Sequence, residues 1–474
     1  MLHEYIYTLS EASLIFGVIN LLILYILGYD TNKIYAKTAR IWLIVSMFFS
    51  IFFYNKTFAP QYFENNSYTL LFKLVIGFFT YIIFIVTSSW FMLENKTGCK
   101  YLILILTSVL ISNLLLTSIN ITITLMGIAL LIYINYRLQS LNYDKISQDA
   151  SKRYLVISLI VILFSISGYI YLYITTGHIT EYSLLKELFT SSSNNIKMYL
   201  AIIFMIIPIL YMLDIAPFHL MVEEKVAKSI LPVSHYFSII IPLIQWGVLI
   251  KLKEYLLFPY NEYLSTAFLI IAIFSIILGA IGANSRINLY RIYAYGRMYH
   301  FGVIMLLLSF FNKNADFSSF IYLLTYLLAL NGIYIVFYNL KSHGEFLSSL
   351  PSLSGYAQTR PHTTRALLIS IFSFLGLPPL AGFLATYSFI DAFLVEKEYI
   401  ILSIVMLFFF ILAKSYLEII KTAYFEQKIK NYDTENKTVL LITLLNIMLI
   451  IIASFNIFGI IETIKDMFNV IYIK

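Results

Sequence analysis

The chain has 474 residues, of which 60% are hydrophobic and only 12% are charged, and its mean hydropathy is +0.84. A soluble domain carries charge at about 25% of its positions, so this composition excludes the soluble class and predicts a protein embedded in lipid. The net charge of +7 is spread thinly through short loops, which argues against a nucleic-acid partner. The single cysteine, Cys99, excludes an intrachain disulfide and a metal site built on cysteines.

Apolar runs bounded by polar loops predict an all-α polytopic membrane protein with about fourteen transmembrane helices. The composition allows this number, because 60% of 474 residues is about 284 apolar residues, enough for roughly 14 spans of 20 residues. In chain order the helices are expected over residues 6–28, 41–54, 68–93, 101–117, 119–137, 153–176, 198–213, 234–252, 263–283, 289–311, 317–340, 363–393, 399–424 and 438–464. Arginines gather in or beside the loops that follow odd-numbered helices, which places those loops on the matrix or cytoplasmic side.

Two proline-containing runs interrupt this apolar pattern, one over residues 214–219 with Pro217 and one over residues 375–383 with Pro378 and Pro379. Proline removes a backbone donor, so a membrane helix keeps such a break only where protein or a water-lined cavity satisfies the freed carbonyl groups. Paired broken helices are typical of transporters built from inverted repeats.

The expected organisation follows from the spacing of these breaks. Three N-terminal helices occupy residues 1–100, a first antiporter-like repeat of five helices occupies 101–255, a second occupies 256–430, and a C-terminal helix occupies 431–474.

Three motifs carry a resemblance to a known family. Ala216-Pro-Phe-His219 is similar to the Ala-Pro-Phe-His-Phe-Trp motif of the subunit 2 family of respiratory NADH:ubiquinone oxidoreductase (complex I), whose bacterial counterpart is chain N. The run Gly376-Leu-Pro-Pro-Leu-Ala-Gly-Phe-Leu384 resembles the Gly-Leu-Pro-Pro-Leu-Thr-Gly-Phe run of that family, and Arg291-Ile-Tyr-Ala-Tyr295 with His300 and Gly302 resembles its Arg-Leu-Leu-Ala-Tyr segment. The motifs follow the family order, and the resemblance implies an antiporter-like fold.

The chain departs from the family where protons are expected to move. Family members use buried lysines and a glutamate, because protons pass between sites whose charged forms are costly in lipid and whose affinities neighbouring charges tune. On the resemblance, the three lysine positions fall at Met212, Pro242 and Thr386, and the nearest match to the glutamate is Asn120.

The loss of these groups does not depend on the details of the alignment. Residues 198–213, 236–250 and 366–390 contain no Lys, Arg, His, Asp or Glu, and residues 95–143 contain no Asp or Glu. The sequence therefore predicts that the family's own proton channel is degenerate in this chain.

Five ionisable residues within or beside the spans remain as candidates for a proton path. Asp214 lies at the first break, where it either relays protons or caps backbone donors, and His219 and His300 match family positions, where each either relays protons or bonds between helices. Lys414 and Glu418 are spaced to share one helix face, which predicts a local structural pair more than a relocated relay.

The resemblance implies a subunit of the proton-pumping complex in the mitochondrial inner membrane, with antiporter-like subunit 4, the small membrane subunits and accessory subunits as partners and phospholipids, including cardiolipin, around it. No cofactor or metal is expected on this chain, because no glycine-rich nucleotide loop, cysteine cluster or histidine pair at metal spacing occurs. FMN, iron-sulfur clusters and the ubiquinone site are expected on other subunits.

Three functions stay open at this point. In the favoured one the subunit is mainly a scaffold between active subunits. In the second it still translocates protons through relocated ionisable residues. A free-standing cation/proton antiporter is the third, and it would need buried carboxylates or lysines in the broken helices.

Overall fold

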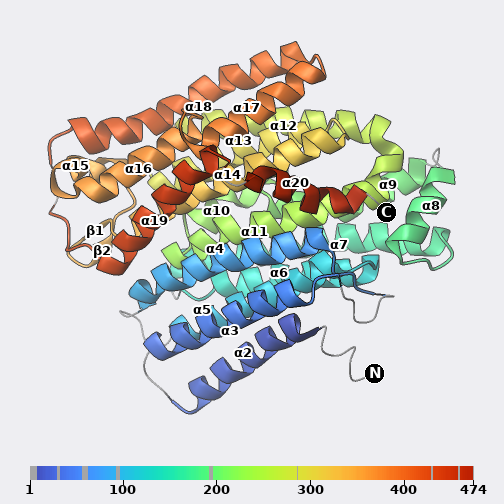
Figure 1. Ribbon diagram of the computed structural model, residues 1–474, viewed down its shortest axis with the longest axis horizontal. Coiled ribbons are helices and arrows are strands. Elements are labelled where there is room, and N and C mark those ends of the chain that lie inside the picture. Colours follow the sequence, from blue (N-terminus) through green and yellow to red (C-terminus); the bar gives the residue numbers. More distant parts are fainter. Residues whose placement is uncertain are drawn as a thin grey trace. The chain divides into compact units, whose positions relative to one another are not determined.

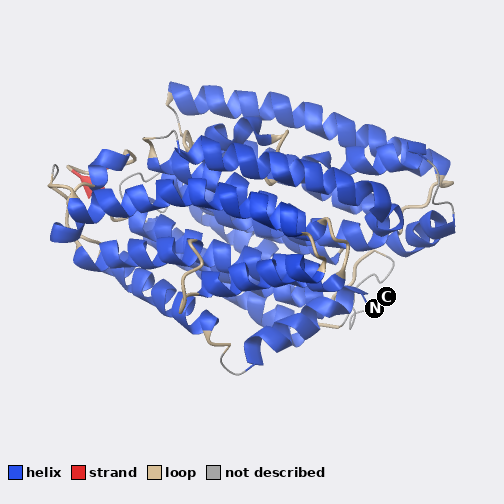
Figure 2. Ribbon diagram, turned by 90° about the horizontal axis from the view of Figure 1, so that it is seen from above, coloured by secondary structure: helices blue, strands red, loops and turns tan. Residues whose placement is uncertain are grey.

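The computed structural model describes residues 8–28, 32–55, 62–91, 97–142, 144–191, 196–284, 287–428, 431–456 and 459–472. These residues are helical almost throughout, apart from a two-stranded hairpin (Figure 2). The chain divides into two compact units. Unit 1 comprises Met1–Leu213, Ile240–Asn261 and Ile464–Lys474, and unit 2 comprises Asp214–Ile239 and Glu262–Thr463.

Unit 1 is a bundle of apolar helices. Its elements are α2 (Leu9–Ile26), α3 (Asn32–Phe52), α4 (Ser67–Phe91), α5 (Thr97–Thr117), α6 (Ile121–Gln139), α7 (Lys145–Thr175), α8 (Tyr182–Ser191), α9 (Ile196–Met212), the second half of α11 (Leu231–Leu252), the π turn η3 (Lys253–Leu257), and the 3-10 turns η4 (Phe258–Tyr260) and η7 (Val470–Tyr472). The helices α2 to α5, in blue in Figure 1, pack on one another, and α7 packs along α9. Gly168 permits the close packing of α7 on α9, since a Cβ there would lie 2.4 Å from the Ala201 carbonyl oxygen.

Unit 2 is built around α14. Its elements are η2 (His219–Met221), α10 (Val222–Val226), the first half of α11, α12 (Asn261–Asn284), α13 (Leu289–Leu308), α14 (Lys313–Phe337), β1 (Lys341–Ser342), β2 (Glu345–Phe346), η5 (Leu350–Leu353), α15 (Tyr356–Thr359), α16 (Pro361–Phe374), α17 (Ala381–Val395), α18 (Tyr399–Phe425) and α19 (Lys437–Ser454). The strands β1 and β2 pair antiparallel, with Lys341 opposite Phe346. Helices α13, α16, α17 and α19 pack on α14, and 89% of the residues in its most apolar stretch are buried inside the protein.

The helical membrane fold expected from the sequence is confirmed. Within the described residues ten helical segments are long and apolar enough to cross a membrane, and two shorter apolar helices, Lys197–Met212 and Ala381–Val395, accompany them. Residues 231–284 form one continuous helical segment, because the turns η3 and η4 join α11 to α12 without an interruption of the helical backbone. Every run expected to span the membrane contains helix.

Some boundaries expected from the sequence are wrong. The C-terminal run over 438–464 is two helices, because α19 ends at Ser454 and α20 (Ile460–Asn469), which has one apolar and one polar face, is separate. Helix α7 begins at Lys145, eight residues earlier than 153. Its first turns are polar, so hydropathy alone does not indicate where the helix begins. The amphipathic helix α8 and the β1–β2 hairpin were not expected.

Both breaks at proline are confirmed, and each is satisfied by side-chain hydroxyl groups. At the first, α9 ends at Met212, Asp214 takes a left-handed backbone conformation with φ of 59°, and the Ala216 amide donates to Ser275 Oγ at 2.9 Å. At the second, between α16 and α17, Ser454 Oγ donates to the Pro379 carbonyl at 2.8 Å. Hydrogen bonds from neighbouring helices thus replace those that the broken turns lose.

Candidate functional site

The first break carries a cluster of three buried charges. Asp214 contacts two cations: Lys225 Nζ lies 2.5 Å from Asp214 Oδ1, and an Arg297 Nη2 hydrogen bond reaches Oδ2. The side chains of Asp214, Lys225 and Arg297 are only 1%, 5% and 2% exposed. They come from the break, from α10 and from α13, and α10 packs directly on α13. We call these three residues the ion cluster.

The start of α11 holds the guanidinium group of the ion cluster. Arg297 Nη1 donates to the Phe237 carbonyl at 2.9 Å and lies 3.4 Å from Ser238 Oγ. Arg297 Nε is buried and has no hydrogen-bond partner among the described residues. Ser238 and Ser234, one turn apart, both contact the Tyr334 hydroxyl, at 2.7 and 3.0 Å. The cluster is therefore connected to α14 through hydroxyl groups.

Polar side chains continue from Tyr334 across unit 2. The His235 ring stacks on Tyr334 with centroids 4.9 Å apart, and its Nε2 lies 3.0 Å from Asn331 Oδ1. Asn331 in turn donates to Asn446 Oδ1 at 2.8 Å, which joins α14 to α19. We call the path from the ion cluster through Ser238, Tyr334, His235 and Asn331 to Asn446 the polar axis. Every side chain in it is buried.

The acidic residues next to the ion cluster have cations of their own. Glu223 Oε2 lies 3.3 Å from Arg291 Nε, and its other oxygen accepts a hydrogen bond from Tyr295 at 3.0 Å. Glu224 pairs with Lys228 at 2.6 Å. These pairs are more exposed than the ion cluster, with Arg291 38% exposed, so water screens them more strongly.

The two candidate histidines occupy different surroundings. His219 is half-buried in η2, where its Nδ1 atom has no partner among the described residues. His300 is buried, its Nδ1 lies 2.9 Å from the Tyr322 hydroxyl, and its Nε2 atom has no partner in the described part of the chain. His300, Tyr322 and Thr386 line a small cavity of about 10 Å³, which is room for about one water molecule.

The predicted pair on α18 is wrong. Lys414 and Glu418 are both exposed, and no ion pair joins them in the structure. A helix spacing of four places two side chains on one face, but long side chains pair only when the contact outweighs their loss of freedom. Neither residue belongs to the polar axis. Of the five candidates, only Asp214 lies within it.

The four positions that the resemblance assigns to the family's proton groups have no ionisable side chain, and their surroundings in the structure are as follows. Asn120 caps α6, with Oδ1 accepting from the Thr122 amide at 2.9 Å and Nδ2 donating to Thr180 at 2.8 Å. Met212 is buried apolar packing at the end of α9, and Pro242 lies inside α11. Thr386 donates its hydroxyl to backbone carbonyls of its own helix.

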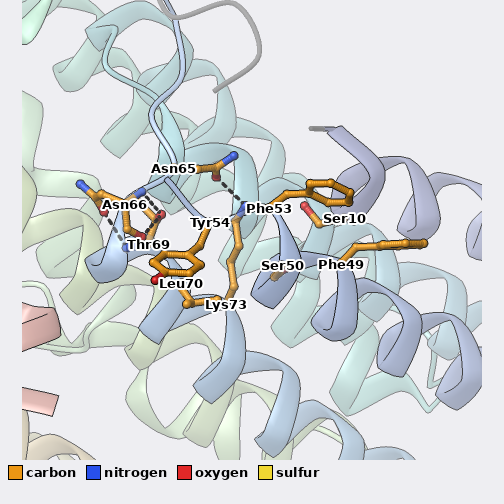
Figure 3. Close-up of a pocket in the computed structure, with 10 residues that line it drawn as sticks. All are labelled: Ser10, Phe49, Ser50, Phe53, Tyr54, Asn65, Asn66, Thr69, Leu70 and Lys73. Atoms are coloured by element: carbon orange, nitrogen blue, oxygen red, sulfur yellow. Dashed lines mark hydrogen bonds between the residues drawn. The ribbon is translucent and has the colours of Figure 1, made fainter. Parts of the chain in front are cut away.

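Two of the buried lysines of unit 1, Lys73 and Lys251, each have a local structural partner. Lys73 on α4 contacts Glu11 at 2.7 Å and Asn65 at 2.9 Å, and Figure 3 shows its side chain reaching Asn65 beside a small cavity between α3 and α4. Lys251 at the end of α11 donates to the Leu116 carbonyl at 3.0 Å and to that of Ser118. Those carbonyls end α5, where a cation is favoured.

A second cluster of polar side chains in unit 2 lies among loops at the ends of its helices. Arg360 donates to the carbonyl groups of Tyr432 and Asp433, the first at 3.3 Å. The Tyr432 hydroxyl donates to the Ser352 carbonyl at 2.8 Å, and burial raises its pKa to about 12. Burial also lowers the pKa of Lys341, against the opposing effect of Asp433. These contacts hold the loops together.

Sequence reasoning missed Lys225 as a site residue. It follows the break in a charged loop, and the fold turns it inward onto Asp214. The available signal was Asp214 itself, since a carboxylate in an apolar run requires a buried cation. Gln245 was missed too: it is buried on α11, and neither of its amide atoms has a hydrogen-bond partner among the described residues.

Comparison with known proteins now gives the family. The family model described as "NADH:quinone oxidoreductase/Mrp antiporter, TM" matches residues 111–412. NADH-quinone oxidoreductase subunit N of Pelagibacter ubique is 27% identical over 341 residues, which is 71% of each chain, and that of a Wolbachia strain from Brugia malayi is 29% identical over 66% of this chain and 68% of its own.

Solved structures agree on the fold. A chain of respiratory complex I from Thermus thermophilus superposes with a TM-score of 0.80 at 17% identity, covering 96% of this chain and 98% of that one. A chain of the Mrp complex from a Dietzia species gives a TM-score of 0.84 at 14% identity, covering 100% and 98%. Because the family model spans well over half of the sequence, the chain belongs to the transmembrane family of NADH:quinone oxidoreductase and Mrp antiporter subunits.

Proposed function

We propose that this chain is a membrane-arm subunit, of the subunit N or subunit 2 type, in a proton-pumping NADH:quinone oxidoreductase. The proposal is supported by the family model and by relatives named subunit N that align over about two thirds or more of both chains. The subunit contributes to the coupled reaction without a redox centre of its own. FMN, iron-sulfur clusters and the quinone site belong to other subunits in this proposal.

The family's proton path does not operate in this subunit. Met212, Pro242, Thr386 and Asn120 cannot exchange protons near neutral pH, and the first two are buried. A scaffold role, favoured by the sequence, follows if nothing else carries the proton.

The polar axis is the single observation that favours continued proton translocation. Replacing a buried ion network by apolar side chains is often neutral or stabilising, so the ion cluster is a poor way to gain stability alone. Ionisable residues inside membrane proteins are costly, and they usually mark ion or proton pathways. The geometry therefore supports a translocating subunit that uses a relocated group of charges, beginning with Asp214, better than a scaffold.

The proton-to-electron ratio of the intact complex tests this conclusion. The complex is measured in sealed membrane vesicles that oxidise NADH, and its ratio is compared with that of a relative that keeps the family lysines. Equal ratios are expected if this subunit pumps. A lower ratio would return the subunit to the scaffold role.

Membership of the complex is tested separately by native electrophoresis of solubilised membranes. The chain is expected to migrate with NADH dehydrogenase activity. If it migrates alone, the chain is a free-standing cation/proton antiporter, which the fold of the Mrp complex also permits.

We further propose the mitochondrial inner membrane as the location, with antiporter-like subunit 4, the small membrane subunits and accessory subunits as neighbours and cardiolipin among the bound phospholipids. Heavy use of Ile, Leu, Phe, Tyr, Lys and Asn beside few arginines supports this location, because organellar genomes are often rich in A and T. The location of the gene tests this proposal. If the gene lies on a bacterial chromosome, the protein belongs to a bacterial membrane and the mitochondrial location is wrong.

A further inference from the structure

We propose that Lys225 is the proton-carrying residue of this subunit and takes over the task of the lysine that is missing at Met212. This inference rests on the proposed function, since it concerns how the subunit contributes to pumping. It stands on the position of Lys225 in the ion cluster, where two cations share the carboxylate of Asp214.

The charges of the cluster single out Lys225. Arginine stays protonated in proteins, so Arg297 is a permanent positive charge and balances Asp214 by itself. With Lys225 protonated the buried cluster carries one surplus positive charge, and with Lys225 neutral it carries none. Both states are therefore accessible, because the cost of burying the surplus charge opposes the attraction of Asp214 for it.

The proton step is simple to write. The N–H bond of the Lys225 ammonium breaks, its electron pair stays on nitrogen, and the proton passes to a water molecule as hydronium. The Asp214 carboxylate and the Arg297 guanidinium remain as a neutral pair. Protonation of the amine from water reverses the step.

Lys225 also lies where an exchange with one side of the membrane is feasible. Helix α10 belongs to the connection after the seventh expected span, and the arginine pattern places that connection on the matrix or cytoplasmic side. Its neighbours on that connection, Glu224 and Lys228, have side chains that are 12% and 23% exposed. On the inner side, Arg297 connects the cluster to Ser238 and the rest of the polar axis.

Three substitutions of Lys225, made in the intact complex, separate a proton carrier from a structural cation. Lys225→Arg keeps the charge but cannot release a proton, Lys225→Gln removes the charge, and Lys225→His restores a group that can exchange protons. Lys228→Gln is the matched control, since Lys228 lies three residues away and pairs with Glu224 outside the cluster. Assembly, NADH oxidation and the proton-to-electron ratio are measured for each.

The proposal expects Lys225→Arg and Lys225→Gln to lower the proton-to-electron ratio equally, by the share of one subunit, and Lys225→His to restore part of the loss. Lys228→Gln is expected to keep the original ratio. An unchanged ratio in Lys225→Arg would show a structural cation and overturn the proposal. If Lys225→Arg does not assemble, the comparison of Lys225→His with Lys225→Gln decides, and equal ratios in these two would also overturn it.

Failure of the proposed function gives a different result. If the chain is not part of the complex, its deletion leaves both assembly and NADH oxidation unchanged, and no substitution of Lys225 affects either of them.

Discussion

Unit 1 and unit 2 both bury cations, but the number of carboxylates that face each buried cation differs between them. In unit 1, Lys73 faces one carboxylate, that of Glu11, and Lys251 closes the carbonyl end of α5. In unit 2, Lys225 and Arg297 share the single carboxylate of Asp214. The Lys73–Glu11 pair is electrically neutral, whereas two cations on one carboxylate leave a proton whose loss removes buried charge. In the proposal made above, this difference separates the paired Lys73 from the proton-carrying Lys225.

The largest effect is expected from Asp214→Asn, which would leave two buried cations without a counter-charge. Removal of one partner from a buried ion network costs about 3–5 kcal/mol, so little assembled complex is expected. Native electrophoresis measures it, with Glu418→Gln as the control on exposed α18. Normal assembly of Asp214→Asn would contradict the tight burial of the cluster.

A smaller effect is expected from Lys73→Met, which breaks the matched pair of unit 1. The stranded Glu11 carboxylate, 14% exposed, should cost about 1–3 kcal/mol, seen as a lower thermal midpoint of the complex. The assembled fraction should pump with an unchanged proton-to-electron ratio, and Glu11→Gln added to Lys73→Met should recover part of the stability. A changed proton-to-electron ratio would show that Lys73 also takes part in pumping and would contradict the difference between the two units.

Lys251→Met should cost about 1–2 kcal/mol, because the carbonyl groups that end α5 lose a charged donor. The thermal midpoint of the purified complex measures the loss, and Lys251→Arg, which keeps the donor, is the control. We expect no effect on the proton-to-electron ratio. An effect there would assign a transport role to unit 1 as well.

The smallest effect is expected from Gln245→Leu on α11. Its amide atoms have no partner in the described protein, so an apolar side chain of similar size should change stability by less than about 1 kcal/mol, and in the stabilising direction. A marked loss of stability or of pumping would instead show that the amide binds an ordered water that unit 1 uses. The same thermal and pumping assays apply.

Much of the architecture follows from local properties of the sequence. The apolar runs, the two breaks at Pro217 and Pro378-Pro379 and the helical class are set by hydropathy and by the missing proline donor, and the structure confirms them. The division into repeats over 101–255 and 256–430 stays a prediction. Boundaries such as the end of α19 at Ser454 were missed, because helix ends depend on what the last turn packs against.

The sequence alone determined that this is a polytopic membrane protein with broken helices, and that residues 198–213, 236–250 and 366–390 carry no ionisable side chain, since these are statements about which residues are present. Only the tertiary structure decided which of the remaining charges meet. Lys414 and Glu418 form no ion pair although only four positions separate them in the sequence. Asp214 and Arg297 contact each other although 83 positions separate them. The physical reason is that pairing in a buried site depends on how helices pack, and a side chain's neighbours there come from distant parts of the chain.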